Sequence, residues 1–331
     1  MLRSETAGDA ARMARALDGL RAYQEAERTP PAAPMPALAE AHGASLRDYG
    51  GEGPAAVFVP SLINPPNILD LAEGKSLLRW LAAKGHRPML VDWGWDVAAR
   101  RGLSVAGHVE EILLPLLRHA GARPALVGYC LGGTMALAAA AHAPVRGVAA
   151  IAAPWHFSRY PADSRAMLAR LWAQAEATVQ GLGLLPMEVL QSAFWSLDPK
   201  RTVAKFEAFA GMAAASEEAR TFVALEDWAN DGPPLGAAAA REMFEGLFAA
   251  DRPGQRDWIV GGSPADPSAL TVPVLNIVSD TDRIVPAATA PDAGERIDLS
   301  LGHVGMVVGS RARKALWEPL AAWLSRTAAN C

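Results

Sequence analysis

The sequence predicts an α/β fold with a mostly parallel central sheet and helices on both of its faces. Three observations support this fold class. Short apolar strands alternate with helical segments, a glycine-rich strand-to-helix turn surrounds Cys130, and the sheet pattern returns after a long helical insertion. Alternation of this kind is typical of parallel sheets, because each parallel connection needs a crossover that a helix usually provides. At 331 residues, 51% of them hydrophobic, the chain is long enough for a large core.

Short apolar runs bounded by turn residues indicate strands, and apolar residues at helical spacing indicate helices. The predicted strands cover residues 55–59, 87–93, 125–127, 145–151, 272–278 and 296–299. The helices predicted to alternate with them cover residues 75–84, 109–119, 135–141 and 311–325. The chain therefore has the strand and helix order of a doubly covered sheet.

The chain divides into three predicted regions. Residues 1–40 are predicted to form an amphipathic helix and a proline-rich linker, since four prolines fall within residues 29–36. Residues 41–154 and 263–331 carry the sheet pattern. Residues 155–262 have helical patterns and no convincing strand, with helices predicted at residues 164–181, 186–195 and 237–250. We interpret this insertion as a cap over the sheet, because the chain returns to the same sheet afterwards; a separate helical domain is the alternative.

Composition excludes several classes of function. A net charge of −4 gives no basic surface for nucleic acid. The first residues lack the apolar stretch of a signal peptide, and no apolar run approaches the length of a membrane span. Cys130 and Cys331 provide no disulfide framework and no zinc ligand set, and Cys331 is expected to be frayed as the last residue. A reactive thiol fits a reducing compartment, so we expect a cytoplasmic protein without a metal.

The most informative motif is Gly-Tyr-Cys-Leu-Gly at residues 128–132, with a strand before it and a small-residue helix after it. It resembles the nucleophile elbow of α/β hydrolases, with cysteine in place of the usual serine. The flanking glycines mark positions where a side chain would collide with the neighbouring strand and helix. Cys130 is therefore predicted to be a nucleophile that acts through a thioester, and an inert buried cysteine is the alternative.

A cysteine nucleophile needs a base and a carboxylate that orients it, which follow it in this chain order in α/β hydrolases. Of seven histidines, His303 lies after the last strand in a glycine-flanked turn, so we predict that it is the base and not a surface histidine. Two carboxylates follow the strand at residues 272–278. Asp282, which begins the pattern Asp-x-Ile-Val-Pro, is the preferred partner of His303, and Asp280 is interpreted as a turn cap.

Backbone N–H groups are expected to complete the site as an oxyanion hole. One donor is predicted at Leu131, the residue after the nucleophile. The second is expected in the loop after the strand at residues 55–59, with Leu62 preferred and Ile63 next. Each such donor typically stabilises the transition state by about 3–4 kcal/mol.

Several motifs together resemble one family. Residues 58–71 read Phe-Val-Pro-Ser-Leu-Ile-Asn-Pro-Pro-Asn-Ile-Leu-Asp-Leu, and residues 128–134 read Gly-Tyr-Cys-Leu-Gly-Gly-Thr. Asp-Arg-Ile-Val-Pro follows at residues 282–286 and Gly-His-Val-Gly at residues 302–305, while Asp-Trp-Ala-Asn-Asp lies at residues 227–231. This combination resembles polyhydroxyalkanoate synthases, which are α/β hydrolases with a modified lipase box. The resemblance covers about residues 50–325, and the length is similar to that of the short class III catalytic subunits.

The resemblance implies an acyltransferase that polymerises 3-hydroxyacyl-CoA through an acyl thioester on Cys130 and releases CoA. It implies no cofactor beyond the CoA thioester substrate. The expected partners are a growing polyester chain or granule surface and either a homodimer or a second synthase subunit. Substrate contacts are expected from Ile63, Asn64, Trp228 and Asp231.

Other functions stay open at this point. A cysteine-dependent hydrolase or single-acyl transferase, similar to dienelactone hydrolases or thioesterases, would use the same three side chains. If the protein were a non-catalytic, granule-associated homologue, we would expect it to have lost these catalytic side chains. Cys130, Asp282 and His303 are all present.

Overall fold

The computed structural model describes residues 1–29 and 33–329, and the chain forms two compact units. The sheet unit comprises Pro34–Met187 and Gly232–Cys331, and the helical unit comprises Met1–Ala33 and Glu188–Asp231. Cys331 and part of the predicted proline-rich linker lie outside the described residues.

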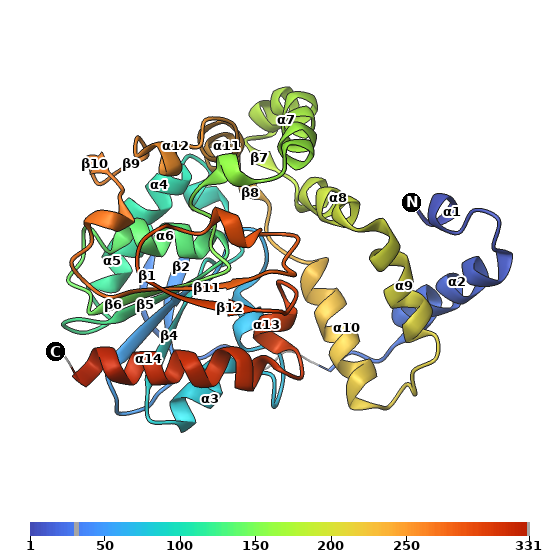
Figure 1. The fold of residues 1–331 in the computed structure, drawn as a ribbon, viewed down its shortest axis with the longest axis horizontal. Helices are drawn as coiled ribbons and strands as arrows, with labels where there is room; N and C mark the ends of the chain where they lie inside the picture. The colour runs from blue at the N-terminus through green and yellow to red at the C-terminus, as the bar shows by residue number, and fades with distance from the viewer. Residues whose placement is uncertain (30–32, 330–331) are drawn as a thin grey trace. The chain divides into compact units, whose positions relative to one another are not determined.

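The sheet unit is built around eight strands in the order β1-β2-β4-β3-β5-β6-β11-β12 (Figure 1). Both pairings of β2, with β1 and with β4, are antiparallel, and the other pairings are parallel. The strand bounds are β1 (Ala37–Ala41), β2 (Ala44–Asp48), β3 (Ala55–Val59), β4 (Arg87–Asp92), β5 (Ala125–Tyr129), β6 (Gly147–Ile151), β11 (Val274–Ser279) and β12 (Glu295–Leu299). The predicted mostly parallel sheet is confirmed. The hairpin of β1 and β2 is an addition that the sequence reasoning missed.

Helices cover both faces of this sheet, as predicted. Figure 1 shows α3 and α14 on one side and α4, α5 and α6 on the other. Their bounds are α3 (Leu77–Ala83), α4 (Val105–His108), α5 (Leu114–Leu117), α6 (Leu131–Ala139), α13 (Gly305–Val308) and α14 (Glu318–Ala329). Two π-helical segments, η3 (Val109–Leu113) and η8 (Arg313–Trp317), continue these helices. Short 3-10 turns occur at η1 (Pro66–Leu69), η2 (Ala98–Arg100), η4 (Phe157–Arg159), η6 (Pro267–Ala269) and η7 (Ala287–Thr289).

Part of the predicted cap belongs to the sheet unit. It contains α7 (Ala162–Leu182), α11 (Ala237–Arg241), the π-helical η5 (Glu242–Ala249) and α12 (Arg252–Gln255). The expectation that no strand occurs here was wrong in detail. β7 (Leu184–Leu185) pairs with β8 (Leu235–Gly236), and β9 (Ile259–Val260) pairs with β10 (Ser263–Pro264). Two-residue strands are too short to produce an alternating pattern, so periodicity does not reveal them.

The helical unit contains the N-terminal helices and helices from the predicted cap. Its elements are α1 (Leu2–Glu5), α2 (Ala10–Glu25), most of α8 (Met187–Leu197), α9 (Pro199–Phe209) and α10 (Glu217–Ala229). Tyr23 of α2 packs against Phe206 and Phe222, and Phe222 stacks on Phe209 with ring centroids 4.3 Å apart. The N-terminal segment therefore shares a core with residues 188–231, and the three-region division of the chain stays a prediction.

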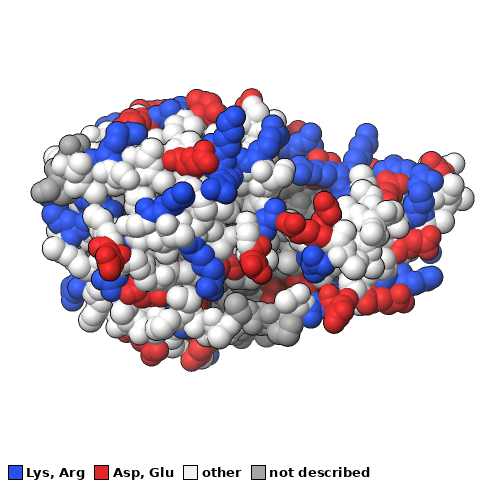
Figure 2. Space-filling view, turned by 90° about the horizontal axis from the view of Figure 1, so that it is seen from below, with Lys and Arg blue, Asp and Glu red and all other residues white. Residues whose placement is uncertain are grey.

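The surface carries charges of both signs. On the face shown in Figure 2, basic and acidic side chains are interspersed with uncharged residues. Among residues 1–29 and 33–329, no helix has both the length and the apolar character needed to cross a bilayer.

Candidate active site

Cys130 occupies a strained turn between β5 and α6. Its φ of 56° and ψ of −131° lie outside the conformations that a side chain normally allows. The Cys130 N–H donates to the Ile151 carbonyl of the adjacent strand at 2.9 Å, and the Cys130 carbonyl accepts from the Gly133 N–H at 2.8 Å. Such strain persists only where the surrounding structure fixes it, and here it places the thiol at the carboxyl edge of the sheet.

The glycines around Cys130 are required by close backbone approach. A Cβ atom at Gly128 would collide with the backbone of Gly133, and one at Gly132 would collide with the carbonyl oxygens of Val59 and Pro60. The collisions predicted from the sequence are therefore confirmed at both positions. The Gly132 contact also shows that the loop after β3 lies against the start of α6.

We expect Gly132→Ala to destabilise the sheet unit by about 1–3 kcal/mol, because the added methyl group would collide with backbone carbonyl oxygens at the end of β3. Urea unfolding would measure the change. Gly181→Ala on α7 is the matched control, since nothing lies within 4 Å of its added methyl group. Alanine there should stabilise the helix by up to about 1 kcal/mol. Equal stabilities of the two variants would contradict the close approach at Gly132.

His303 and Asp282 form a buried hydrogen-bonded pair. The His303 Nδ1 atom lies 2.6 Å from Oδ2 of Asp282, and the exposed fractions of the two side chains are 7% and 0%. The other carboxylate oxygen of Asp282, Oδ1, accepts the backbone N–H groups of Ile284 and Val285 at 2.8 and 3.0 Å. These bonds fix the carboxylate and direct it at the imidazole ring. Asp280, the alternative acid, is exposed and accepts a hydrogen bond from Ser300.

The electrostatic environment favours the protonated form of His303. Burial alone lowers the pKa of His303, but the charges of Asp282 and Cys130 and hydrogen bonds to both residues outweigh it and raise the pKa to about 10. The ring therefore lies in the electrostatic field of both Asp282 and Cys130, with Asp282 the stronger of the two. It also stacks on Tyr129, with ring centroids 4.9 Å apart.

This raised pKa predicts an imidazolium that persists above neutral pH. The folded-state pKa of His303 lies above the ordinary 6.5, so the stabilisation it contributes is present below that value and is lost as pH rises through about 10. Ring-nitrogen NMR near pH ~8 should find His303 protonated. His108 is the internal control, because burial lowers its pKa to about 4 and its ring should be neutral. A His303 ring that titrates near its ordinary pKa would contradict the prediction.

The two backbone N–H groups predicted for the oxyanion hole have no acceptor in the described chain. Within the part of the chain that the structure describes, neither the Leu131 N–H nor the Leu62 N–H makes a hydrogen bond. The Ile63 N–H donates instead to Ser61 Oγ at 3.2 Å. This difference favours Leu62 over Ile63 as a donor to a bound oxyanion.

Sequence reasoning missed several residues that position the site. The Tyr129 hydroxyl donates to the His303 carbonyl at 3.2 Å. The Ser279 hydroxyl donates to the carbonyl of Leu301, two residues before the histidine, and accepts the N–H of the same residue. The only sequence signal for either residue is its place at the carboxyl end of a strand.

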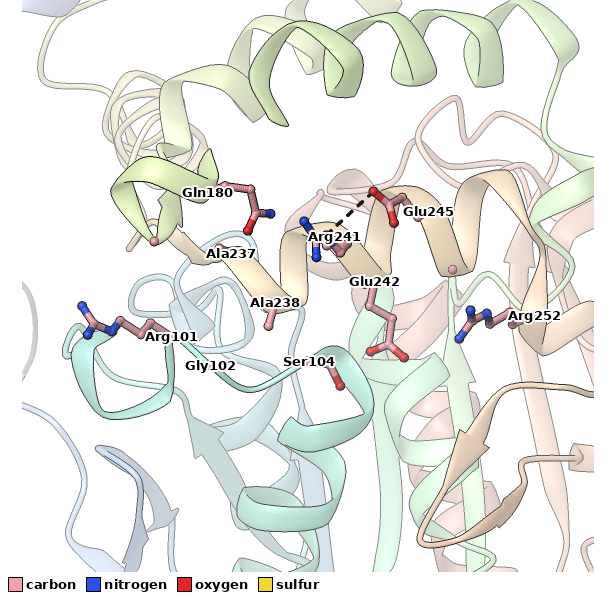
Figure 3. Close-up of a pocket in the computed structure, with 12 residues that line it drawn as sticks. Arg101, Gly102, Ser104, Gln180, Ala237, Ala238, Arg241, Glu242, Glu245 and Arg252 are labelled. Atoms are coloured by element: carbon pink, nitrogen blue, oxygen red, sulfur yellow. Dashed lines mark ion pairs between the residues drawn. The ribbon is translucent and has the colours of Figure 1, made fainter. Parts of the chain in front are cut away.

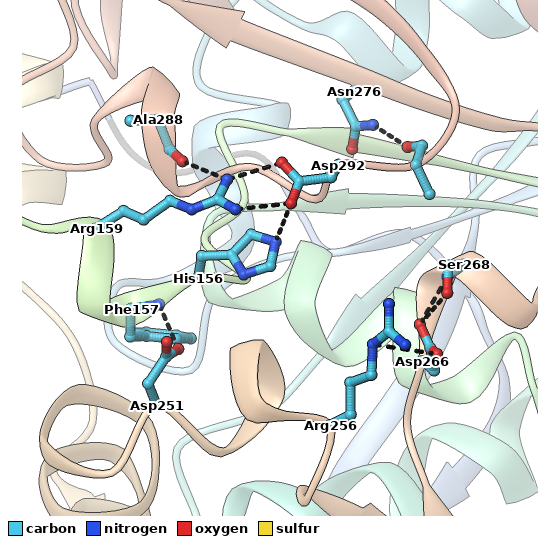
Figure 4. Close-up of polar contacts among 11 residues, drawn as sticks. His156, Phe157, Arg159, Asp251, Arg256, Asp266, Ser268, Asn276, Ala288 and Asp292 are labelled. Carbon is cyan, nitrogen blue, oxygen red and sulfur yellow. Dashed lines mark hydrogen bonds and ion pairs between the residues drawn. The ribbon is translucent and has the colours of Figure 1, made fainter.

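The loops after β6 and β11 are also tied together (Figure 4). Asp292 accepts two 2.7 Å hydrogen bonds from Arg159 and lies 3.1 Å from His156 Nε2. Asp251 accepts the Phe157 N–H. Asp292 thus holds His156 in place. These bonds brace the loop that follows Asp282.

The remaining predicted site residues fall into two places. The Ile63 carbonyl and Asn64 border Gly232, where the chain re-enters the sheet unit. Trp228 is buried on α10 and Asp231 follows that helix, both in the helical unit. A substrate-binding role stays a prediction for all four residues.

Comparison with known proteins identifies the fold family of this chain. Residues 100–303 match the profile of the alpha/beta hydrolase fold. The chain belongs to this family. Among solved structures, this α/β hydrolase resembles a carboxylesterase of Nitrososphaera gargenis (TM-score 0.55, 12% identity, 89% of this chain and 100% of that one). It also resembles the monoacylglycerol lipase of Paleococcus ferrophilus (TM-score 0.51, 16% identity, 85% and 98%). At these identities the likeness shows the fold alone, and the predicted fold class is confirmed.

Sequence relatives are more specific. The α/β hydrolase is 27% identical to the poly(3-hydroxyalkanoate) polymerase subunit PhaC of Haloferax mediterranei, over 81% of this chain and 58% of that protein. It is 26% identical to the corresponding subunit of Allochromatium vinosum, over 92% and 84%. The chain spans 64% of a third such subunit, from Haloarcula marismortui. The predicted resemblance to polyhydroxyalkanoate synthases is confirmed.

Proposed function

We propose that this α/β hydrolase is an acyltransferase that polymerises 3-hydroxyacyl-CoA into a polyhydroxyalkanoate through an acyl thioester on Cys130. The observation that carries the proposal is the buried 2.6 Å pair of His303 and Asp282, whose imidazole ring stacks on Tyr129, the residue before Cys130. The similarity to PhaC subunits supports the substrate class.

In the first half of the reaction, the Cys130 sulfur attacks the thioester carbonyl carbon of 3-hydroxyacyl-CoA. An imidazolium at His303 favours the attacking thiolate, and Asp282 holds the ring in orientation. The Leu62 and Leu131 N–H groups, which lack other acceptors in the described chain, are suited to stabilise the tetrahedral oxyanion. The carbon–sulfur bond to CoA then breaks, and the CoA sulfur takes the proton from His303.

In the second half, neutral His303 accepts the proton of a 3-hydroxyl group. The hydroxyl oxygen attacks the Cys130 thioester, an ester bond forms, and the bond to the Cys130 sulfur breaks. The cysteine leaves as a thiolate beside the protonated ring, which restores the starting state. Water in place of the hydroxyl group would give hydrolysis instead.

The surroundings of this chemistry are part of the proposal. Ile63, Asn64, Trp228 and Asp231 are proposed substrate contacts. The proposed partners are the growing polyester or granule surface and a second subunit of the same or another synthase chain, in the cytoplasm and with no resident cofactor.

The test is turnover of 3-hydroxybutyryl-CoA, with CoA release, turbidity and the intact mass of the protein as readouts. We expect CoA release, an insoluble polyester and a hydroxyacyl adduct on the protein. Release of CoA with only free hydroxy acid would overturn polymerisation in favour of a hydrolase. A protein that neither releases CoA nor gains mass would overturn acyl transfer.

A further inference from the structure

A cavity of about 610 Å³ lies in the sheet unit, and none of its lining residues belongs to the candidate active site. Its walls come from the loop before α4, the end of α7 and the run from α11 to α12 (Figure 3). Three arginines line it: Arg101, Arg241 and Arg252. In Figure 3, Arg101 and Arg252 lie at opposite ends and Arg241 lies between them.

The arginines at the two ends are available to a ligand. Arg101 and Arg252 are exposed, and neither side chain has a hydrogen bond or ion pair with any residue that the structure describes. Arg241 lies 3.7 Å from Glu176 and 3.9 Å from Glu245, which are distances too long for hydrogen bonds. All three guanidinium groups thus keep donors for an anion.

The two glutamates that line the cavity accept hydrogen bonds from its walls. Glu242 accepts the Ala106 N–H at 2.8 Å through Oε2 and the Trp258 indole N–H at 2.9 Å through Oε1. Glu245 accepts the Trp172 indole N–H at 2.9 Å. These hydrogen bonds link the walls of the cavity and occupy both carboxylate oxygens of Glu242 and one of Glu245. Arg241 has glutamates nearby, so the uncompensated positive charge of the cavity lies at its two ends, at Arg101 and Arg252.

We propose that this cavity binds an elongated organic phosphate that has anionic groups near both of its ends. A guanidinium fork matches two oxygens of a phosphate, and two such forks at opposite ends select a ligand with separated charges. One source is the phosphate-bearing end of the CoA substrate, a choice that rests on the proposed function. The other source is a separate phosphorylated effector.

Calorimetric binding of coenzyme A, ADP and pyrophosphate tests the cavity without any turnover. We expect Arg101→Gln with Arg252→Gln to weaken binding by roughly tenfold or more, because each removes charged hydrogen bonds. The fold should survive, since neither side chain makes a hydrogen bond or ion pair with a residue that the structure describes. Arg118→Gln is the matched control, because Arg118 is exposed in the same unit and does not line the cavity. Unchanged affinity in the double variant, or no binding to the wild-type chain, would overturn the proposal.

Kinetics then distinguish the two sources. If the cavity holds the CoA end of the substrate, the double variant should raise KM for 3-hydroxybutyryl-CoA and leave KM for the same acyl group on pantetheine unchanged. If binding is lost and neither KM changes, the ligand is a separate effector. Absence of acyl-transfer activity would contradict the proposed function but would leave the calorimetric result intact. The binding measurement therefore tests the cavity independently of turnover.

Discussion

Cys130→Ala should eliminate CoA release and the hydroxyacyl adduct, with a loss in kcat on the order of a million-fold. A loss of this size is typical when the nucleophile of an acyl-transferring site is removed and the binding groups remain. Intact-mass measurement after exposure to 3-hydroxybutyryl-CoA would check the adduct, and thioester absorbance would check turnover. Alanine is smaller than cysteine, so it does not add a clash in the strained turn between β5 and α6.

The second cysteine is the matched control for this experiment. Cys331→Ala leaves Cys130 in place, and we expect its adduct and turnover to equal those of the wild-type chain. An adduct that persists in Cys130→Ala and disappears in Cys331→Ala would contradict the assignment of the nucleophile. Equal urea midpoints for the two variants would establish that loss of activity is not loss of fold.

The parts of the fold that the sequence predicted well are those with a strong local pattern. Residues 55–59 were predicted as a strand and coincide with β3, because five consecutive apolar residues suit a strand buried on both faces. The elbow was predictable for a related reason. Glycines at 128 and 132 leave room for a close backbone approach that the structure confirms.

The features that sequence reasoning missed depend on contacts between distant residues. β1 and β2 form an antiparallel hairpin at the sheet edge, where polar residues interrupt the apolar pattern. Tyr129 stacks on His303, which lies 174 positions later in the chain, so no local sequence pattern predicts this contact. In the same way, composition shows arginines but not which of them keep free donors at a cavity.

Asp282→Asn should lower kcat by roughly 10³–10⁴-fold with little change in KM. The amide oxygen can still accept the N–H groups of Ile284 and Val285, so the loop after β11 should keep its shape. The amide NH₂ group would then face His303 Nδ1, which must become an acceptor, and the ring proton would move to the other nitrogen. A ring in that tautomer cannot take a proton from Cys130 or from a substrate hydroxyl. Loss of the carboxylate charge should also lower the pKa of His303 from its raised value.

Asp280→Asn is the control that separates the two candidate acids. Asp280 is exposed, and an amide oxygen can replace the carboxylate oxygen that accepts the Ser300 hydroxyl, so we expect kcat within about twofold of wild type. Steady-state kinetics of both variants, with thermal unfolding to confirm their folds, would measure the difference. A larger loss in Asp280→Asn would assign the acid to Asp280, and equal small losses would mean that His303 needs neither carboxylate. His303 Nδ1 and Asp282 Oδ2 are 2.6 Å apart and shielded from water. We therefore expect the loss of kcat to occur only in Asp282→Asn.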